Sequence, residues 1–150
     1  MKIKKTKIKN LKIIFSPTYK DNRGYFREIF KKKFFNQNKF VFTCVSCSKK
    51  NVLRGMHLQK KFSQGKYLSV LKGEIFDVAI DLRKKSKSFG KYFSTKISDK
   101  NGISIYIPPG FAHGFVGLKK ENIISYHCTN LRSKKHEIGI IWNDKDLRIK

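Results

Sequence analysis

Short β-rich runs separated by turn residues repeat along this sequence, and they limit the folds open to it. The run 75–82 is typical, with branched and aromatic residues throughout, and the triplet Lys72-Gly73-Glu74 before it predicts a hairpin turn. No long stretch has apolar residues repeating at the three- to four-residue spacing of an amphipathic helix. The sequence therefore predicts an all-β sandwich or barrel. Its expected strands cover residues 8–15, 25–30, 40–48, 52–59, 67–71, 75–82, 92–97, 103–107, 123–129 and 138–142.

The length and the apolar content fit one domain over residues 1–150. A chain of 150 residues can bury a sizeable core, and 13 Phe, 6 Tyr and 1 Trp supply bulky side chains for it. No apolar run approaches the ~20 residues that a membrane helix needs. The first residues carry charge but no apolar region of a secretory signal. We expect a cytoplasmic protein without a membrane partner.

The charge balance is strongly basic, with 35 Lys+Arg against 10 Asp+Glu and a formal net charge of +25. Nucleic-acid binding is one explanation for such an excess. The lysines, however, are scattered along the whole chain, and no basic helix or zinc finger is present. We expect a general attraction for anionic ligands, with a basic nucleic-acid-binding protein as an alternative.

The three cysteines do not form a metal-binding pattern. Cys44 and Cys47 have the spacing of half a zinc knuckle, but a second pair at ligand spacing is missing, and Cys128 stands alone. On a strand, a spacing of three residues points Cys44 and Cys47 to opposite faces. We expect buried free thiols and no metal site.

Two histidines stand in stretches that suggest a pocket. Arg54 and His57 lie within the apolar run 52–59, and His113 lies between glycines and aromatic residues in the run 108–115. A lone histidine in such a run is more often a hydrogen-bonded core residue. Two of them near glycines, together with an arginine that is costly to bury unpaired, favour a binding site. An anionic substrate would satisfy Arg54.

Strand geometry adds two constraints on this region. Strict alternation would put Arg54 and His57 on opposite faces, so a shared site needs a β-bulge, for which Gly55 is the natural place. Asp77 and Asp81 share one face of an otherwise apolar run, so a buried aspartate there needs a partner.

Five strings follow one another along the chain: DNRGYFRE (21–28), VLRGMHLQ (52–59), FDVAIDLR (76–83), PGFAHGF (109–115) and GIIWND (139–144). Together they resemble the dTDP-4-dehydrorhamnose 3,5-epimerase family. The resemblance implies a cupin-like β jelly roll, also called a double-stranded β-helix, that forms a homodimer and uses no cofactor. It implies an isomerase that epimerises a nucleotide-linked 4-keto-6-deoxy sugar, of the dTDP-4-dehydro-6-deoxyglucose type, at carbon 3, carbon 5 or both. The pathway implied is dTDP-rhamnose and surface-polysaccharide biosynthesis.

The resemblance also implies roles for individual residues. His57 corresponds to the base that removes a proton beside the 4-keto group, Tyr126 to the acid that returns one from the opposite face, and Lys66 to a lysine near the keto oxygen. Asp77 corresponds to a partner of His113. The residues that match substrate-contacting positions are Arg23, Phe26, Glu28, Arg54, His113 and Glu137, with Phe26 near the nucleotide base.

These residue types suit the chemistry. A proton beside a carbonyl is lost only when the enolate oxygen is stabilised, which an ammonium does well where water is excluded. A neutral imidazole suits the base, and inversion needs a separate acid on the other face. The guanidinium of Arg54 matches the oxygens of a diphosphate.

The sequence departs from the family pattern at two places. Family members continue with a tail whose aspartate pairs with the catalytic histidine, whereas this sequence ends at Lys150, so we expect His57 to lack that carboxylate. Either Asp77, Asp81 or Asp144 substitutes, or turnover is slow or limited to one carbon. We expect the second outcome, because Asp77 corresponds to the partner of His113 and Asp144 lies in the segment that precedes the family's tail. Phe42 and Cys44 stand where the family usually has glutamine and asparagine near the nucleotide, which leaves the nucleotide open.

Other functions remain as alternatives. A 3,4-ketoisomerase of similar sugars has the same fold, and a protein of this fold can bind nucleotide sugars without turning them over. A metal-dependent oxygenase is less well supported, because His57-Leu58-Gln59 lacks the paired ligands of a facial triad.

Overall fold

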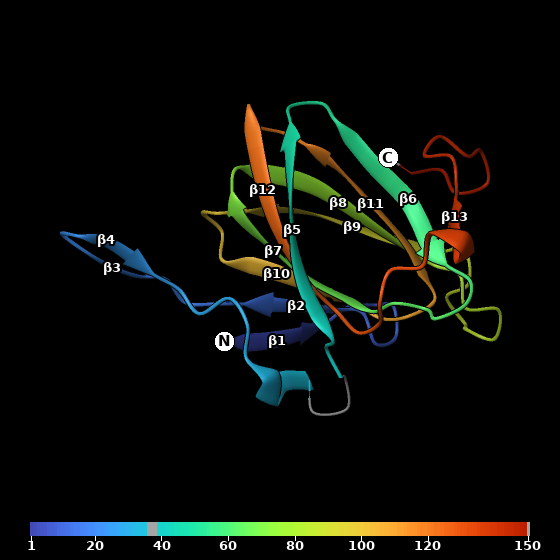
Figure 1. Cartoon of the computed structure of the whole chain (residues 1–150), viewed down its shortest axis with the longest axis horizontal. Helices are drawn as coiled ribbons and strands as arrows, with labels where there is room; N and C mark the ends of the chain where they lie inside the picture. The colour runs from blue at the N-terminus through green and yellow to red at the C-terminus, as the bar shows by residue number, and fades with distance from the viewer. Residues whose placement is uncertain (36–38, 150) are drawn as a thin grey trace.

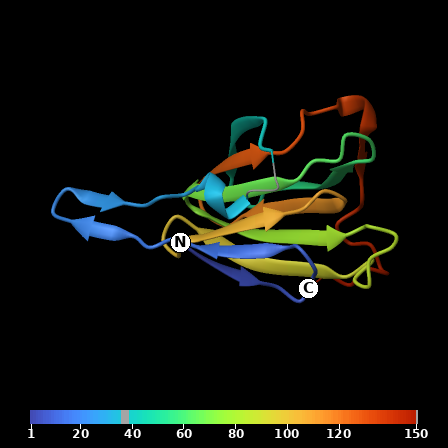
Figure 2. The same ribbon diagram turned by 90° about the horizontal axis from the view of Figure 1, so that it is seen from below.

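Two antiparallel sheets packed face to face form the body of the protein (Figures 1 and 2). The computed structural model describes residues 1–35 and 39–149. The six-stranded sheet has the order β1 (Lys2–Lys5), β2 (Lys12–Phe15), β10 (Ile103–Ile107), β7 (Lys66–Lys72), β12 (Glu121–Cys128) and β5 (Phe42–Lys49). The five-stranded sheet has the order β13 (Glu137–Gly139), β6 (Leu53–Gln59), β11 (Phe111–Gly117), β8 (Glu74–Asp81) and β9 (Tyr92–Ser98).

This architecture confirms the all-β jelly-roll expectation. Helical structure in the described residues is confined to two single turns of 3-10 helix, η1 (Lys32–Phe35) and η2 (Lys134–His136). Within residues 1–35 and 39–149, no helix is long and apolar enough to cross a membrane.

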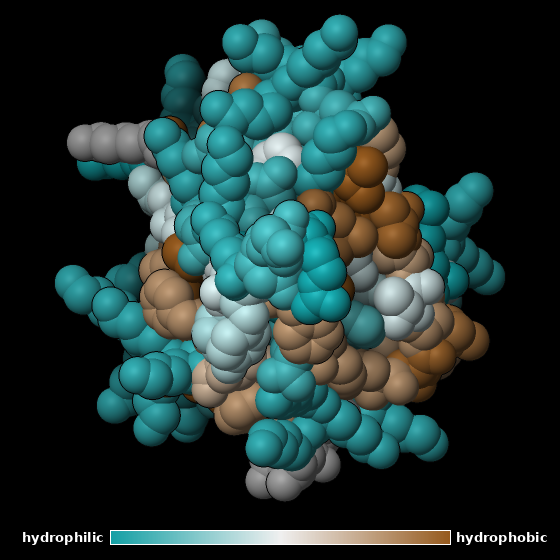
Figure 3. Space-filling model, turned by 90° about the vertical axis from the view of Figure 1, so that its left-hand side faces the viewer, coloured by the Kyte–Doolittle hydropathy of each residue, from teal (hydrophilic) through white to brown (hydrophobic). Residues whose placement is uncertain are grey.

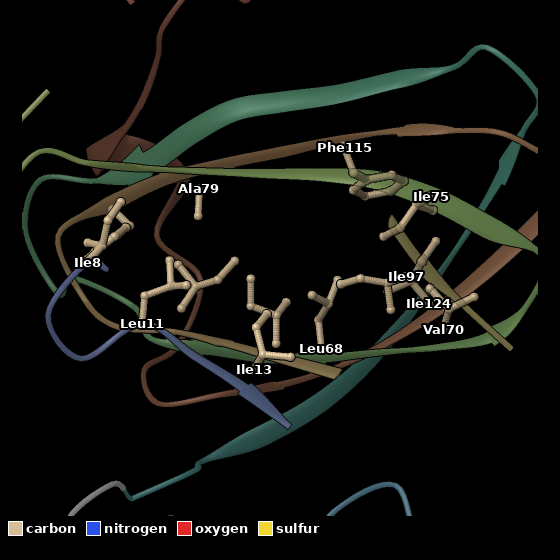
Figure 4. Close-up of a cluster of buried hydrophobic side chains, with 13 residues drawn as sticks. Ile8, Leu11, Ile13, Leu68, Val70, Ile75, Ala79, Ile97, Phe115 and Ile124 are labelled. Atoms are coloured by element: carbon tan, nitrogen blue, oxygen red, sulfur yellow. The ribbon is translucent and has the colours of Figure 1, made fainter. Parts of the chain in front are cut away.

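The core lies between the sheets, where alternate residues of each strand point inward (Figure 4). Along β8, Ile75 and Ala79 face this layer with no exposed surface, and Asp77 and Asp81 share their face as expected. The intervening residues Phe76, Val78 and Ile80 belong to a second apolar cluster on the outer side of the sheet.

The predicted hairpin at Lys72-Gly73-Glu74 is wrong. β7 pairs with β10 and β12 in one sheet, while β8 pairs with β9 and β11 in the other, so the chain crosses between layers at Gly73. Gly73 has φ +85°, and a Cβ there would lie 2.3 Å from the carbonyl oxygen of Glu121. A residue distant in the sequence stabilises this corner, because the Asp99 carboxylate accepts a hydrogen bond from the Gly73 amide at 3.0 Å. Three strands were not among those expected: β1, β11 and a short strand β3 (Tyr19–Asp21).

The bulge predicted at Gly55 is present. His57 of β6 pairs with His113 of β11 and Arg54 pairs with Phe115, so three residue steps on β6 face two on β11. Gly55 has φ +111°, and a Cβ would lie 2.5 Å from both the Gly114 Cα and the His113 carbonyl oxygen. The bulge brings Arg54 and His57 to one side of the strand.

A two-stranded hairpin projects from the body (Figures 1 and 2). Its strands are β3 (Tyr19–Asp21) and β4 (Gly24–Phe26), and we call residues 18–27 the arm. In the turn at its tip, the Asp21 Oδ1 accepts a hydrogen bond from the Arg23 amide at 2.9 Å, as aspartate side chains commonly do in turns. Seen from the side on which the arm projects, the surface is mostly hydrophilic with separate hydrophobic areas (Figure 3).

Candidate active site

A pocket of about 390 Å³ lies between the two sheets and is lined by residues of both. The structure brings together in it six of the residues that the sequence assigned to the site. They are Arg54 and His57 from β6, Lys66 from β7, His113 from β11, Tyr126 from β12 and Glu137 from β13.

His57 stands half-buried on β6, directly after the bulge. Burial, and secondarily the positive charge of Lys66, lowers the pKa of its imidazole to about 4. The negative charge of Glu137 acts in the other direction. Glu137 pairs with Gln59, two residues from His57 on the neighbouring strand, so the two side chains share a face of the sheet. His57 is therefore neutral at pH 7 and able to accept a proton.

Lys66 contributes an ammonium group to the same pocket from the start of β7. Within the described part of the chain it forms no ion pair or side-chain hydrogen bond. Burial lowers its pKa. A desolvated cation without a carboxylate partner is well suited to meet a negative oxygen.

Tyr126 reaches the pocket from the six-stranded sheet, whereas His57 comes from the five-stranded sheet. Its hydroxyl lies 3.0 Å from the Ser46 Oγ on the neighbouring strand β5. Burial raises the pKa of this phenol well above its ordinary value of 10, so it stays protonated over the working range of pH. A proton acceptor and a proton donor thus stand on opposite walls of one pocket.

His113 pairs with Asp77, as expected, with its Nε2 2.7 Å from Asp77 Oδ2. Both side chains are buried, on the neighbouring strands β11 and β8. The carboxylate fixes the orientation of the imidazole ring, which faces the pocket beside His57.

Arg54 keeps an uncompensated charge at the pocket. Its Nε donates to Ser48 Oγ at 2.7 Å and an Nη donates to the Cys47 carbonyl oxygen at 3.0 Å, and both acceptors are neutral. No carboxylate of the described residues forms an ion pair with it. The guanidinium is therefore held in place with its positive charge available to an anion.

Arg132 also lines the pocket and was missed by the sequence reasoning. Its Nε lies 3.2 Å from Glu137 Oε2, so it fixes the carboxylate whose charge acts on His57. Arg132 lies in the loop after β12 among ordinary polar residues, and no motif marks it in the sequence.

Three predicted substrate-binding residues lie outside this pocket. Arg23 and Phe26 are on the projecting arm, and Glu28 follows it and pairs with Lys31. Arg23 pairs at the exposed tip with Asp21 at 2.7 Å. One copy of the chain does not bring these three residues together with His57.

The thiols differ in part from expectation. All three cysteines are free, but only Cys128 is buried, while Cys44 and Cys47 are exposed. Cys44 and Cys128 line the pocket, and Cys47 points elsewhere, as the strand alternation predicted. Phe42 also lines the pocket. Among the residues that the structure describes, no cluster of three or more metal-ligating side chains occurs.

A larger hollow of about 960 Å³ lies at the corner between β7 and β8 and is ringed by lysines. Its charges are partly neutralised among themselves, with Lys72 2.6 Å from Glu121 and Lys119 3.5 Å from Glu74. It holds no histidine or tyrosine. The smaller pocket between the sheets is therefore the better candidate for proton-transfer chemistry.

The sequence is also similar to those of known proteins. The sequence model of the dTDP-4-dehydrorhamnose 3,5-epimerase family matches residues 5–150. A dTDP-4-dehydrorhamnose 3,5-epimerase of Methanothermobacter thermautotrophicus is 44% identical over 149 residues, with 97% of this chain and 80% of the relative covered. One of Shigella flexneri is 41% identical over 155 residues, with 99% of this chain and 86% of the relative covered.

A solved structure extends the likeness to the whole fold. The dTDP-6-deoxy-D-glucose-3,5-epimerase of Legionella pneumophila, crystallised with dTDP-4-keto-L-rhamnose, superposes with a TM-score of 0.94 at 40% identity. The superposition covers 99% of this chain and 81% of that one. This protein is therefore a member of the dTDP-4-dehydrorhamnose 3,5-epimerase family.

Proposed function

We propose that this protein epimerises a nucleotide-linked 4-keto-6-deoxy sugar, of the dTDP-4-dehydro-6-deoxyglucose type, at carbon 3, carbon 5 or both, as a step of dTDP-rhamnose biosynthesis. The observation that carries the proposal is the approach of His57 and Tyr126 to one pocket from opposite sheets. Inversion at a carbon needs this arrangement, because the proton leaves one face and another proton arrives at the other face.

The first step is proton removal beside the 4-keto group. His57, which is neutral at pH 7, takes the proton, and the electron pair of the C–H bond moves toward the carbonyl oxygen to give an enolate. The ammonium of Lys66, in the same pocket and without a carboxylate partner in the described chain, stabilises that oxygen. Such stabilisation acts on the charge that develops in the transition state.

The second step is proton return from the opposite wall. Tyr126 stays protonated because burial raises its pKa, and its hydroxyl faces the same pocket. Donation of this proton to the carbanionic carbon inverts its configuration. The Ser46 hydroxyl, 3.0 Å away, stabilises the phenolate that remains.

The positive charge at the pocket supports an anionic substrate. Arg54 is held by neutral acceptors and keeps its charge free, which suits a diphosphate. The Legionella pneumophila relative was crystallised with dTDP-4-keto-L-rhamnose, a ligand that carries such a group. Phe42 and Cys44 line the same pocket and are expected to influence which nucleotide is accepted.

A homodimer would complete the site. Strand β5 is at the edge of the six-stranded sheet and, in the described chain, pairs only with β12. Its residues Phe42 and Cys44 line the pocket, so a strand added at this edge would stand beside the site. The arm is such a strand pair, with Phe26 64% exposed. In this proposal the arm of one copy lies along β5 of the other and brings Arg23 and Phe26 to its pocket.

Hydrogen–deuterium exchange tests the proposed reaction. We expect that dTDP-4-keto-6-deoxyglucose incubated with the protein in deuterated water gains deuterium at carbon 3, carbon 5 or both, as followed by NMR. A carbonyl that moves to carbon 3 would identify a ketoisomerase instead. Binding of the sugar nucleotide without any exchange would identify a non-catalytic binding protein.

A further inference from the structure

The side chain of Arg27 joins the two ends of the arm to the body of the protein. Its Nε donates to the Thr18 Oγ1 at 2.7 Å, across the stem of the hairpin. One of its Nη atoms donates to the Asp99 carbonyl oxygen at 2.7 Å, in the turn between β9 and β10. The guanidinium carbon also lies 5.5 Å from the centre of the Tyr25 ring. One side chain therefore contacts both stems of the arm and the body.

This role distinguishes Arg27 from the other charged residues of the arm. Lys20, Asp21 and Arg23 are exposed, and the ion pair between Asp21 and Arg23 stays within the tip. Arg27 is half-buried. Among the described side chains of residues 18–27, Arg27 makes the only hydrogen bond that leaves the arm.

We propose that Arg27 is a positioning residue that clasps the base of the arm and sets the direction in which the arm leaves the body. The inference rests on the proposed function, in which the arm completes the pocket of a second copy. The clasp acts through Arg23 and Phe26, which the arm carries, and Arg27 itself does not touch the substrate.

The physical reason is preorganisation. A two-stranded hairpin alone is marginally stable in water, so an arm without the clasp samples many directions. Ordering it on a partner then costs conformational entropy, which weakens the association and the binding of a substrate that contacts the arm. The chemical step is affected much less, because His57, Lys66 and Tyr126 all lie in the body.

Three variants and a control test the clasp. Arg27→Ala removes both hydrogen bonds, Thr18→Val removes one acceptor with little change of shape, and the double variant measures their coupling. Lys20→Ala changes an exposed charge of the arm that has no partner among the described residues. Each protein is assayed for its dimer dissociation constant, for KM and kcat with dTDP-4-keto-6-deoxyglucose, and for hydrogen exchange of the arm amides.

We expect Arg27→Ala to raise the dimer dissociation constant and KM about tenfold, since hydrogen bonds to a charged group are worth roughly this factor, while kcat changes little. The arm amides should exchange faster. Thr18→Val should have a smaller effect in the same direction and none when Arg27 is already alanine. Lys20→Ala should behave as the unchanged protein.

The outcomes separate the clasp from the proposed function. Unchanged KM, dimerisation and arm exchange in both single variants would overturn the clasp, whatever the activity of the native protein. A fall of kcat in Arg27→Ala and Thr18→Val without any change of KM would also overturn the clasp. Absence of exchange at carbons 3 and 5 in the native protein would instead refute the proposed reaction, while the arm amides would still report the clasp.

Discussion

Asp77 and His113 meet at 2.7 Å in a place where 0% of one side chain and 4% of the other reach solvent. The second oxygen of Asp77 is buried without a hydrogen-bond partner in the described structure. Removal of either partner from such a pair leaves a polar group buried and unpaired, which is strongly destabilising.

We expect Asp77→Ala to lower the free energy of unfolding by about 3 kcal/mol or more, as measured by urea denaturation. Asp21→Ala is the matched control, because Asp21 also pairs with a basic side chain, that of Arg23, but at the exposed tip of the arm. Its denaturation midpoint should stay close to that of the unchanged protein. Equal midpoints for both variants would contradict a structural role of the buried pair.

Deuterium incorporation into the substrate should distinguish the roles of His57 and Tyr126. His57→Asn removes the base, so exchange at carbons 3 and 5 should fall by roughly 10² to 10⁴-fold. Tyr126→Phe keeps the base, so deuterium should still enter the substrate, but from the face on which the proton left, and the product should not form. Tyr106→Phe, a buried tyrosine outside the pocket, should change neither quantity.

NMR detects both incorporation and configuration in the same sample. Loss of exchange in Tyr126→Phe together with full exchange in His57→Asn would reverse the assignment of base and acid.

Charged groups around His57 shift the pKa of its imidazole in opposite directions. The imidazole acts as a base when neutral, so kcat/KM should fall as the pH drops through about 4, rather than through 6.5. Glu137 raises this pKa and Arg132 lowers it, alongside the lowering effects of Lys66 and His113. We expect Glu137→Gln to move the titration to lower pH and Arg132→Gln to move it to higher pH.

An NMR titration of the His57 imidazole measures these shifts without any need for activity. Shifts of the same sign in both variants would mean that the fold around His57 has changed instead of its electrostatics.

Gly55 should tolerate no side chain. In Gly55→Ala the new Cβ meets backbone atoms at 2.5 Å, and the bulge that carries Arg54 and His57 must shift, so both stability and exchange at the sugar should fall. Gly90→Ala is the control, since Gly90 also has a positive φ, of +75°, but nothing lies within 4 Å of its Cβ position. That variant should lose about 1 to 3 kcal/mol of stability and keep its activity. Similar losses in the two variants would argue against the steric role of the close approach.

Most of the fold could be predicted because strand composition is a local property. The runs around Ile75 and Ile105 are apolar and β-branched enough to be recognised as strands. The bulge at Gly55 was predicted from strand alternation together with the expectation that Arg54 and His57 share one site. The corner at Gly73 could not be predicted in this way. Its three residues read as a hairpin turn, and only the distant partners Asp99 and Asn122, which accept from the Gly73 and Glu74 amides, show that the chain changes sheet there.

The candidate site could be predicted mainly through the resemblance to a known family. Arg54, His57 and His113 lie in the strings that carry the resemblance. Lys66, Tyr126 and Glu137 lie outside those strings and were assigned only because they match family positions. Six assigned residues meet in one pocket, although they come from both sheets. Two arginines were not predicted. Arg132 pairs with Glu137 from a loop that carries no recognisable motif. Arg27 contacts Asp99, which is too far along the chain for a local pattern to reveal. The exposure of Cys44 was also missed, since a strand residue at a sheet edge has the same local sequence as one at its centre.

The change of sheet at Gly73 has a consequence for how the chain folds. β7 and β8 do not pair with each other, so β7 becomes paired only when β10 and β12, which come later in the sequence, are in place. Lys66, for example, pairs with Cys128 across the whole intervening chain. Gln59 likewise meets Glu137. Loop-closure entropy is lost before such contacts form, and chains dominated by distant pairings fold in milliseconds to seconds instead of microseconds. We therefore expect slow refolding, during which the unpaired edges of β5 and β7 are exposed to other copies of the chain.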